Sequence, residues 1–489
     1  MLPQPHQPTL SWSATLLLIL VAFLAIIPGI SHHDRVLTRH EVLAAQPARE
    51  MLKDGKWIVP HFVGVPRYQK PAATGWLIAA STAALGENEF AVRLPSVLAG
   101  AALTLIIARM TAKILGPRAG LLAGLLQATS IYLMIQARLA EADIFVMVCA
   151  AFALSASVDA AIGRATRATA WVFYLALAVG FVFKGPIILL YPLVGLTIFA
   201  FWGGRQSLRP LLANPFAIII ALLIMVAWPV AAYLSDPGII QGWQQETVGR
   251  MVGDLDTTAE TPKLNKYLVG LTEYAVDVPW VVLPWLPLIV IGGWRARAYG
   301  WLDRPGAGRL LTAWFWGTFI VLTLAMWRQK HYIFPVLPAL IPAAALALHH
   351  WARGMRRPRL FLAILFALPL VVMGWFWTQY MPKHDGYRSS AALGQVTSKL
   401  VPAGETIYLL DLGQHHIAWY TRWPMARIEG KQLDPWLKDL KTVRYAIMDE
   451  AEAEKLATAG HCEVLQTEKP MGGKRPRARV SLVKLLPRP

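Results

Sequence analysis

Long apolar runs constrain the fold of this chain more than any other feature of its sequence. A transmembrane helix needs about 20 mostly apolar residues to cross the hydrocarbon core of a bilayer. About eleven runs in the sequence approach this length. They lie near residues 13–30, 94–112, 119–136, 144–162, 169–183, 186–202, 214–234, 278–294, 310–326, 332–350 and 360–379. The pattern predicts an all-α polytopic membrane protein with about eleven transmembrane helices.

The amino-acid composition supports the same fold class. Of the 489 residues, 56% are hydrophobic and only 16% are charged, whereas soluble domains carry about 25% charged residues. The formal net charge is +18, but the basic residues are scattered among hydrophobic loops and form no basic domain. Contact with anionic lipid headgroups explains them better than nucleic-acid binding.

The first apolar run is expected to be a retained membrane anchor. It begins near Ser13, no lysine or arginine precedes it, and no small-residue cleavage site follows it, unlike a secretory signal peptide. The two cysteines are Cys149, in an apolar run, and Cys462, in the polar C-terminal part. They fit neither a disulfide framework nor a CxxC metal motif.

The distribution of lysine and arginine predicts which loops face the cytoplasm, because short cytoplasmic loops are enriched in these residues. With the N-terminus inside, the first outer loop is 31–93 and the loop 235–277 is also outside. Within the latter, Arg250–Tyr267 is either a lid or a solvated connector. Ala72–Leu85 is too short for a span, so we expect a surface or re-entrant helix there. The basic cytoplasmic residues are Lys113, Arg118, Arg164, Arg167, Arg205, Arg209, Arg295, Arg297, Arg304, Arg309, Arg353, Arg356, Arg357 and Arg359.

The sequence predicts two domains, residues 1–380 in the membrane and residues 381–489 outside the cytoplasm. From about Met381 the composition becomes polar, as expected of a small α/β domain. The expected strands are Glu405–Leu412, Val443–Asp449 and Val480–Leu486, and the expected helices are Leu433–Leu440 and Glu450–Ala459.

The first outer loop is dense in charged residues, which are costly at a membrane edge unless they are paired or functional. Glu41–Leu52 is expected to form a short helix that lies on the membrane, and solvated charges on an interfacial helix are the alternative explanation. The loop contains an ordered series of short motifs, and related motifs recur along the chain. They are Arg49-Glu50-Met51-Leu52, Gly55, Trp57, Pro60, Lys70-Pro71, Gly86-Glu87-Asn88-Glu89-Phe90, Arg93-Leu94-Pro95, Ala137-Arg138-Leu139-Ala140, Asp143, Lys184-Gly185-Pro186, Pro279-Trp280 and Lys330-His331-Tyr332 with Pro335.

This series resembles the ArnT-type aminoarabinose transferases and the related protein O-mannosyltransferases over most of residues 31–340. The resemblance implies the GT-C fold and an inverting glycosyltransferase whose donor is a polyprenyl-phosphate sugar. The leaving group is then an anionic phosphate, which basic side chains should bind. Lys70 matches the family position suggested to contact the carrier phosphate, and snorkelling to the interface is the alternative role for each cation. The candidate phosphate-binding residues are Lys70, Arg138, Lys184, Arg328, Lys330 and Tyr332.

The general base is less clear, because the family carries an acidic pair where this chain has His40-Glu41. Glu41 ranks first as the base, Asp143 second and His40 third, since imidazole accepts a proton near neutral pH. The histidines and carboxylates of the first loop match no metal motif such as HExxH. No metal ligands are therefore assigned, and a divalent cation stays possible, because some relatives need one and others do not.

The resemblance implies transfer of a sugar to a lipid (lipid A-like), glycan or protein acceptor. The expected location is the outer face of a bacterial inner membrane. Two alternatives remain at this point: a polytopic lipid-phosphate transporter or flippase, and a non-catalytic scaffold, which the replacement at His40 keeps open. A transporter typically shows paired repeats and charges at mid-membrane, whereas here the charges lie at segment ends. The sequence identifies neither the sugar nor the acceptor.

Overall fold

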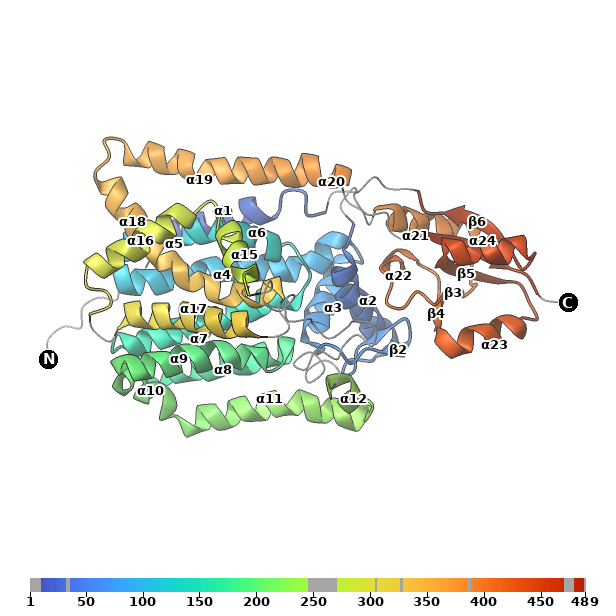
Figure 1. The fold of residues 1–489 in the computed structure, drawn as a ribbon, viewed down its shortest axis with the longest axis horizontal. Helices are drawn as coiled ribbons and strands as arrows, with labels where there is room; N and C mark the ends of the chain where they lie inside the picture. Colours follow the sequence, from blue (N-terminus) through green and yellow to red (C-terminus); the bar gives the residue numbers. More distant parts are fainter. Residues whose placement is uncertain are drawn as a thin grey trace. The chain divides into compact units, whose positions relative to one another are not determined.

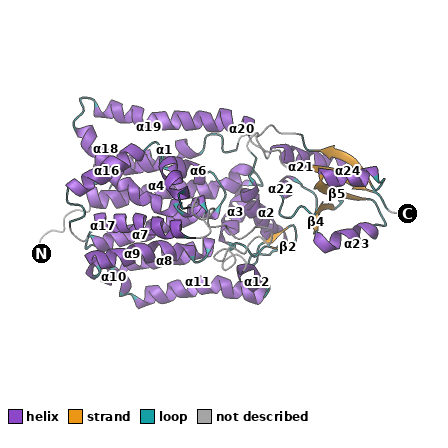
Figure 2. Ribbon diagram, in the orientation of Figure 1, coloured by secondary structure: helices purple, strands orange, loops and turns teal. Residues whose placement is uncertain are grey.

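The computed structural model describes residues 10–31, 36–244, 271–303, 306–325, 329–384, 388–469 and 479–487. Arg328, His32, His33 and the whole of the segment Arg250–Tyr267 lie outside these ranges. The described chain is mostly helical, and its strands are short (Figure 2).

The chain divides into two compact units, each described separately below. The helical unit comprises Met1–Pro28, Tyr68–Ala73 and Arg93–Trp375. The loop–sheet unit comprises Gly29–Arg67, Thr74–Val92 and Phe376–Pro489, so most of the first outer loop groups with the C-terminal residues. The division at residue 380 stays a prediction.

The helical unit contains the apolar helices. Helices α7, α8, α9 and α17 run side by side in it, and α16 packs against α18 (Figure 1). The helices are α1 (Trp12–Ile26), α4 (Glu89–Leu115), α5 (Pro117–Ala128), α6 (Ile131–Gln136), α7 (Ala142–Ala161), α8 (Arg167–Lys184), α9 (Ile187–Phe199), α10 (Arg209–Leu212), α11 (Pro215–Ser235), α12 (Ile239–Trp243), α15 (Glu273–Val281), α16 (Leu286–Ala298), α17 (Ala307–Leu324), α18 (Ile341–Arg353) and α19 (Pro358–Trp375), with the shorter turns η1 (Ala200–Gly204), η2 (Gln206–Leu208), η4 (Lys330–Tyr332) and η5 (Phe334–Leu340).

Eight helices among the described residues are long and apolar enough to cross a membrane, or nine if α15 and α16, bent by 102°, form one span. The predicted number was about eleven. The difference arises where a predicted run forms shorter helices: α1 has 15 residues, and the run 119–136 breaks between α5 and α6. At that break the Thr129 and Ser130 hydroxyls donate to the carbonyls of Leu125 and Leu126, at 2.6 and 2.7 Å. The all-α membrane fold is confirmed.

Exposed apolar side chains show which helices face lipid. Phe216 and Leu234 of α11 are 74% and 76% exposed, and Leu368 and Val371 of α19 are 63% and 68% exposed. Apolar patches of this extent are unfavourable in water and are expected where a helix contacts lipid. The chain is an integral, multi-pass membrane protein.

The loop–sheet unit contains the helices of the first outer loop and a mixed β-sheet. The sheet order is β4-β3-β5-β7-β6, with β3 parallel to β4 and β5, and β7 antiparallel to β5 and β6. The elements are α2 (Arg39–Asp54), β1 (His61–Phe62), β2 (Val65–Pro66), α3 (Ala73–Leu85), η6 (Phe376–Tyr380), α20 (Met381–His384), α21 (Arg388–Leu400), β3 (Ile407–Leu410), α22 (Ile417–Tyr420), β4 (Met425–Ile428), η7 (Gly430–Gln432), α23 (Leu433–Lys438), β5 (Arg444–Asp449), α24 (Glu450–Thr458), β6 (Cys462–Thr467) and β7 (Val480–Leu485).

The predicted small α/β domain is confirmed, because the three expected strands appear as β3, β5 and β7 and the two expected helices as α23 and α24. These three strands form the centre of the sheet, where Ile407, Ile447 and Leu482 are fully buried. The edge strands β4 and β6 were missed. Every residue of β4 is only partly buried and β6 is largely exposed, so neither presents the apolar alternation of a strand with one buried face.

Candidate active site

A buried ion pair joins two helix ends in the helical unit. Asp143 lies in the first turn of α7 and Lys184 is the last residue of α8. The Lys184 Nζ donates to Asp143 Oδ1, and the two side chains are only 6% and 9% exposed. A carboxylate at a helix N-terminus and an ammonium at a C-terminus are each stabilised by the helix dipole. The two helix ends therefore stabilise the charged forms of Asp143 and Lys184.

Three further groups surround this pair. The His331 Nε2 lies 4.0 Å from Asp143 Oδ1, and the Lys184 Nζ lies 4.7 Å from the centroid of the Tyr332 ring. Lys70 is close enough to act electrostatically on Asp143. The structure thus brings together four predicted site residues, Lys70, Asp143, Lys184 and Tyr332, and adds His331. We call these five residues the Asp143 cluster.

The turn η4, which carries His331 and Tyr332, is anchored to its neighbours through main-chain atoms. The Tyr191 hydroxyl donates to the Tyr332 carbonyl at 3.1 Å, and the Tyr274 hydroxyl donates to the Gln329 carbonyl at 2.8 Å. Lys330 begins the same turn, but its side chain is 76% exposed and its ammonium pairs with Asp277 at 3.0 Å. Its predicted contact with phosphate stays a prediction, as does that of Arg328.

Tyr68 holds the backbone that leads to Lys70. Its hydroxyl donates to Asp236 Oδ2 at 2.6 Å, just after the end of α11. A Cβ added at Gly242 would lie 2.3 Å from the Tyr68 Cβ, so α12 approaches this side chain closely only because residue 242 is glycine. Burial, helped by the hydrogen bond to Asp236, raises the pKa of Tyr68 to about 12.

Arg138 has a different environment. It is fully buried, and its guanidinium donates to the carbonyls of Ile26 and Pro28, the second at 2.6 Å. The last carbonyls of a helix have no partner inside the helix, so Arg138 closes the end of α1. Its binding of a lipid phosphate also stays a prediction.

Glu41 and His40 lie in the first turn of α2, in the loop–sheet unit. Glu41 is fully buried. Its Oε2 accepts the Thr38 N–H at 2.9 Å, while its own N–H donates to Thr38 Oγ1 at 3.3 Å. This reciprocal capping box stabilises the start of the helix. His40 is exposed. The structure therefore gives Glu41 a structural task, and its role as a base remains a prediction.

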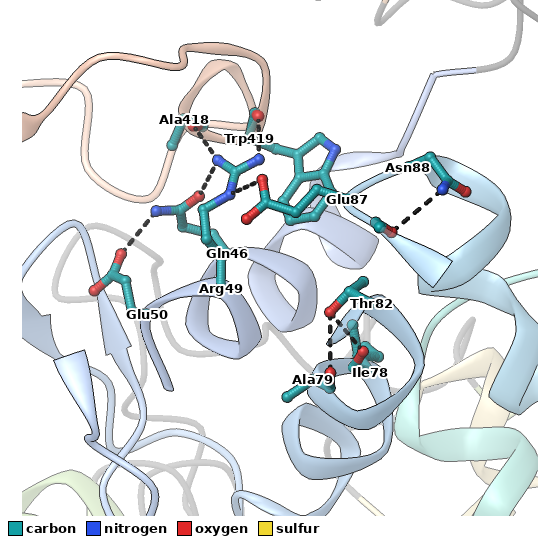
Figure 3. Close-up of polar contacts among 11 residues, drawn as sticks. Gln46, Arg49, Glu50, Ile78, Ala79, Thr82, Glu87, Asn88, Ala418 and Trp419 are labelled. Atoms are coloured by element: carbon teal, nitrogen blue, oxygen red, sulfur yellow. Dashed lines mark hydrogen bonds and ion pairs between the residues drawn. The ribbon is translucent and has the colours of Figure 1, made fainter. Parts of the chain in front are cut away.

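The motif residue Glu50 holds a strained hairpin turn and also accepts a hydrogen bond from Gln46, the contact that Figure 3 shows. Its carboxylate accepts Gln46 Nε2 at 2.8 Å, Val63 N at 2.6 Å and Gly64 N at 3.1 Å. Val63 and Gly64 connect β1 to β2 and have φ values of +52° and +75°. Two-residue hairpins require such values and prefer Asn-Gly, whereas a β-branched residue there is strained. The buried carboxylate compensates by accepting both turn amides.

Arg49, the neighbouring motif residue, ties α2 to the chain around α22. Its guanidinium donates to Glu87 Oε2 at 2.9 Å, to Gln46 Oε1 at 3.1 Å and to the Trp419 carbonyl at 2.9 Å (Figure 3). It also stacks 4.0 Å from the Trp419 ring centroid. Burial lowers the pKa of Arg49, against the opposing effect of Glu87. Sequence reasoning recognised Arg49 and Glu50 as motif matches but missed these structural roles.

The described residues contain no group of three His, Cys, Asp or Glu side chains placed to hold a metal ion. The Asp143 cluster contains one carboxylate and one imidazole, and Lys184 already places an ammonium on that carboxylate. A bound ammonium and a bound metal compete for the same carboxylate. The arrangement is better suited to binding an anion through its cations.

Comparison with known proteins shows which sequences this chain resembles. Residues 69–233 match a family model described as dolichyl-phosphate-mannose-protein mannosyltransferase. The chain is 31% identical over 353 residues to undecaprenyl phosphate-alpha-4-amino-4-deoxy-L-arabinose arabinosyl transferase 1 of Pseudomonas fluorescens, covering 69% of this chain and 59% of that protein. It is 26% identical over 448 residues to the corresponding transferase of Edwardsiella ictaluri, covering 86% and 75%. The chain spans about six tenths of the length of the Pseudomonas relatives.

Solved structures show the same fold. The crystal structure of apo ArnT from Cupriavidus metallidurans matches with a TM-score of 0.76 at 16% identity, covering 96% of this chain and 98% of that one. The same protein bound to undecaprenyl phosphate matches with a TM-score of 0.73 at 17% identity, covering 96% and 97%. An oligosaccharyltransferase from Archaeoglobus fulgidus matches with 0.53 at 15% identity, covering 91% and 69%. The resemblance predicted from the sequence is confirmed: the chain is ArnT-like in sequence and has the GT-C fold of the ArnT structures.

Proposed function

We propose that this chain is an inverting glycosyltransferase that takes its sugar from a polyprenyl-phosphate donor. The observation that carries the proposal is the Asp143 cluster, in which a buried carboxylate and several cations meet at helix ends of an apolar bundle. Ionisable groups inside a membrane protein are expensive and usually serve a function. The curated relatives, named as arabinosyl transferases that use undecaprenyl phosphate sugars, support the same assignment.

The cluster supplies both activities that the reaction needs. Lys184 and Lys70 carry the positive charge that an anionic phosphate requires. In the described structure Lys184 is bound to Asp143. A donor phosphate that attracts the Lys184 ammonium would release the Asp143 carboxylate as a base. Donor binding and activation of the acceptor are then coupled through one lysine.

The chemical step is a single displacement at the anomeric carbon. The acceptor oxygen forms the new bond to this carbon while the bond from the carbon to the phosphate oxygen breaks. The acceptor proton goes to the Asp143 carboxylate, and the lipid phosphate leaves with the bonding electrons, stabilised by Lys184 and Lys70. Glu41, ranked first from the sequence, is here the second candidate base because its carboxylate already caps α2, and His40 stays the third. No organic cofactor takes part, and a divalent cation at the phosphate would show itself as loss of activity on chelation.

The proposed setting is the outer face of a bacterial inner membrane. The acceptor is a lipid of the lipid A type, another glycan or a protein, reached from the aqueous side or the outer leaflet. The ArnT structure solved with undecaprenyl phosphate shows that this fold accommodates a polyprenyl phosphate. The relatives named as arabinosyl transferases favour a 4-amino-4-deoxy-L-arabinose donor as the first sugar to test.

The decisive experiment gives purified protein, in lipid nanodiscs, a polyprenyl-phosphate donor with a radiolabelled sugar and an extract of envelope glycolipids. Label transferred to an acceptor supports the proposal, provided that Asp143→Asn lowers the rate of transfer by about a hundredfold or more. The alternatives predict other results. In sealed liposomes a flippase would move labelled donor between leaflets without transfer, and a scaffold would do neither.

A further inference from the structure

A cavity in the loop–sheet unit has no part in the chemical step proposed above. Its volume is about 940 Å³, within the usual range of small-molecule sites. It is bounded by α2, by the turn at Val63 and Gly64, by residues 87–89 and by the segment that follows α22. None of its lining residues belongs to the Asp143 cluster.

The wall of this cavity combines aromatic rings with hydrogen-bonding groups. Trp419 and Trp423 line it together with Gln46, Lys53 and Asn88. Arg49 covers one face of Trp419, whereas Trp423 is half-buried, so part of this second ring remains accessible. A pyranose presents both kinds of surface, because its C–H face packs on an indole ring while its hydroxyls donate and accept hydrogen bonds.

The charges of the lining argue against an anionic ligand. Phosphate sites in proteins gather cations, and here carboxylates are at least as numerous as basic groups. A phosphorylated sugar would therefore meet repulsion as well as attraction, while an uncharged sugar meets many hydrogen-bonding groups and has no charge to be repelled. The lining cations are Arg49, Lys53 and Arg422, and the lining anions are Glu50, Asp54, Glu87 and Glu89.

The cavity wall is already held in place by hydrogen bonds. Glu50 fixes the turn at Val63, and Arg49 is bound to Glu87 and to the Trp419 carbonyl. Asn88 Oδ1 accepts the Ala91 N–H at 2.9 Å, and its Nδ2 donates to the Leu85 carbonyl at 3.0 Å. A ligand entering such a preformed site orders few side chains, so little of its binding energy is lost.

We propose that this cavity binds an uncharged or zwitterionic sugar of the acceptor, other than the sugar that receives the new bond. The assignment rests on the proposed glycosyltransferase function, which supplies a glycan acceptor. It gives the C-terminal residues a direct role in acceptor selection, because Trp419 and Trp423 belong to them.

Binding can be measured without any reaction. The probes are chitotriose, maltotriose and mannotriose as neutral sugars and glucose 6-phosphate as the anion, titrated into the full-length protein in nanodiscs by saturation-transfer NMR. We expect saturable binding of at least one neutral trisaccharide, weakened about tenfold by Trp423→Ala, which is about 1.4 kcal/mol. Trp423→Phe should retain much of the affinity. Trp57→Ala, at a 40% exposed tryptophan of the same unit outside the cavity, should leave it unchanged.

Three results would overturn the assignment: no neutral trisaccharide binds saturably, Trp423→Ala binds as wild type does, or glucose 6-phosphate binds more tightly than every trisaccharide. Turnover then separates this proposal from the proposed function. In a transferring enzyme, Trp423→Ala should raise the acceptor KM and leave kcat and donor hydrolysis by water unchanged. Transfer with an unchanged acceptor KM refutes only the cavity assignment. Trisaccharide binding that depends on Trp423, in a protein that transfers no sugar, refutes only the transferase.

Discussion

Two buried polar networks, one in each unit, use similar side chains in different ways. In the loop–sheet unit, the Glu50 carboxylate accepts hydrogen bonds from the amides of Val63 and Gly64. The Arg49 guanidinium donates one to the carbonyl of Trp419. In the helical unit, the Asp143 carboxylate forms an ion pair with Lys184 and lies close to His331. Main-chain groups are fixed partners, whereas another charged side chain can be exchanged for a ligand. The first network therefore stabilises the fold, and the second is suited to change during a reaction.

The largest effect that would test this comparison is expected from Asp143→Asn. The amide keeps the shape of the side chain but cannot take up a proton, so kcat should fall by about 10²–10⁴, while donor binding should not weaken because Lys184 no longer has to leave a carboxylate. Single-turnover transfer and donor titration measure the two quantities. Asp159→Asn is the matched control, because Asp159 lies on the same helix and pairs with Lys113 at 2.6 Å. Equal losses in both variants would remove Asp143 from the chemistry.

The next largest effect is expected from Lys184→Ala, which deprives the donor phosphate of its cation. The value of kcat/KM for the donor should fall by about 10²–10³, the usual effect of losing one group that stabilises transition-state charge. Initial transfer rates at several donor concentrations measure it. Lys113→Ala removes the cation of the comparable pair with Asp159 and should leave donor kinetics unchanged. An unaltered kcat/KM in Lys184→Ala would contradict the exchange of Lys184 between carboxylate and phosphate.

In the other network, Glu50→Ala should affect stability more than chemistry. It leaves two turn amides and the Gln46 amide without their acceptor, so the free energy of unfolding should fall by about 2–4 kcal/mol. Thermal unfolding in detergent, monitored by tryptophan fluorescence, reports this change. Glu452→Ala breaks only an exposed pair with Lys455 and should change stability by less than about 0.5 kcal/mol. Wild-type stability of Glu50→Ala would show that the turn does not depend on hydrogen bonds to the Glu50 carboxylate.

A smaller effect of opposite sign is expected at the turn itself. Val63→Asn relieves the strain of a β-branched residue at positive φ but also removes an apolar side chain that is only 4% exposed, and we expect the first effect to exceed the second by about 1 kcal/mol. The same unfolding assay measures the gain. Val65→Asn, two residues later in β2 and 40% exposed, has no such strain to relieve and should bring no gain. A loss of stability in Val63→Asn would mean that the valine side chain contributes more than its backbone costs.

The smallest effect is expected at Tyr68, which belongs to neither network. Its neutral hydroxyl donates a hydrogen bond to the single carboxylate of Asp236. Its pKa is about 12 in the folded protein and about 10 when unfolded, so folding favours the protonated phenol. The contribution to stability is complete below about pH 10 and is lost as the pH rises through 12. Unfolding midpoints of wild type and Tyr68→Phe should therefore differ by a constant amount up to about pH 10 and converge above it. Parallel profiles across this range would show that the phenol does not titrate as described.

The sequence was sufficient to predict the fold class and those elements that have a clear hydrophobic periodicity. Helix α2 was expected over Glu41–Leu52 and spans Arg39–Asp54, since a capping threonine and a terminal glycine mark its ends. The number of spans was overestimated, because hydropathy does not register a break such as Thr129–Ser130, where side-chain hydroxyls compete for helix carbonyls.

Site residues were harder to predict than elements, because a motif match does not reveal which atoms a side chain contacts. Arg49 and Glu50 are consecutive in the sequence, yet one binds a carbonyl 370 positions later and the other a turn 13 positions later. His331 lies between two predicted residues and was not itself selected. Its approach to Asp143 depends on the position of the turn η4, which is set by tertiary packing and not by local sequence.

The contacts of Arg49 have a consequence for any attempt to shorten the protein. The guanidinium is bound to the Trp419 carbonyl, and the Tyr420 hydroxyl accepts the Leu37 N–H at 2.6 Å. Deleting everything after residue 380 would remove the partners of Arg49 in α2 and of Leu37 just before α2 at once. The residues after 380 are thus needed to stabilise the first outer loop. A truncated protein should be degraded in the cell even though its apolar segments could still insert into the membrane.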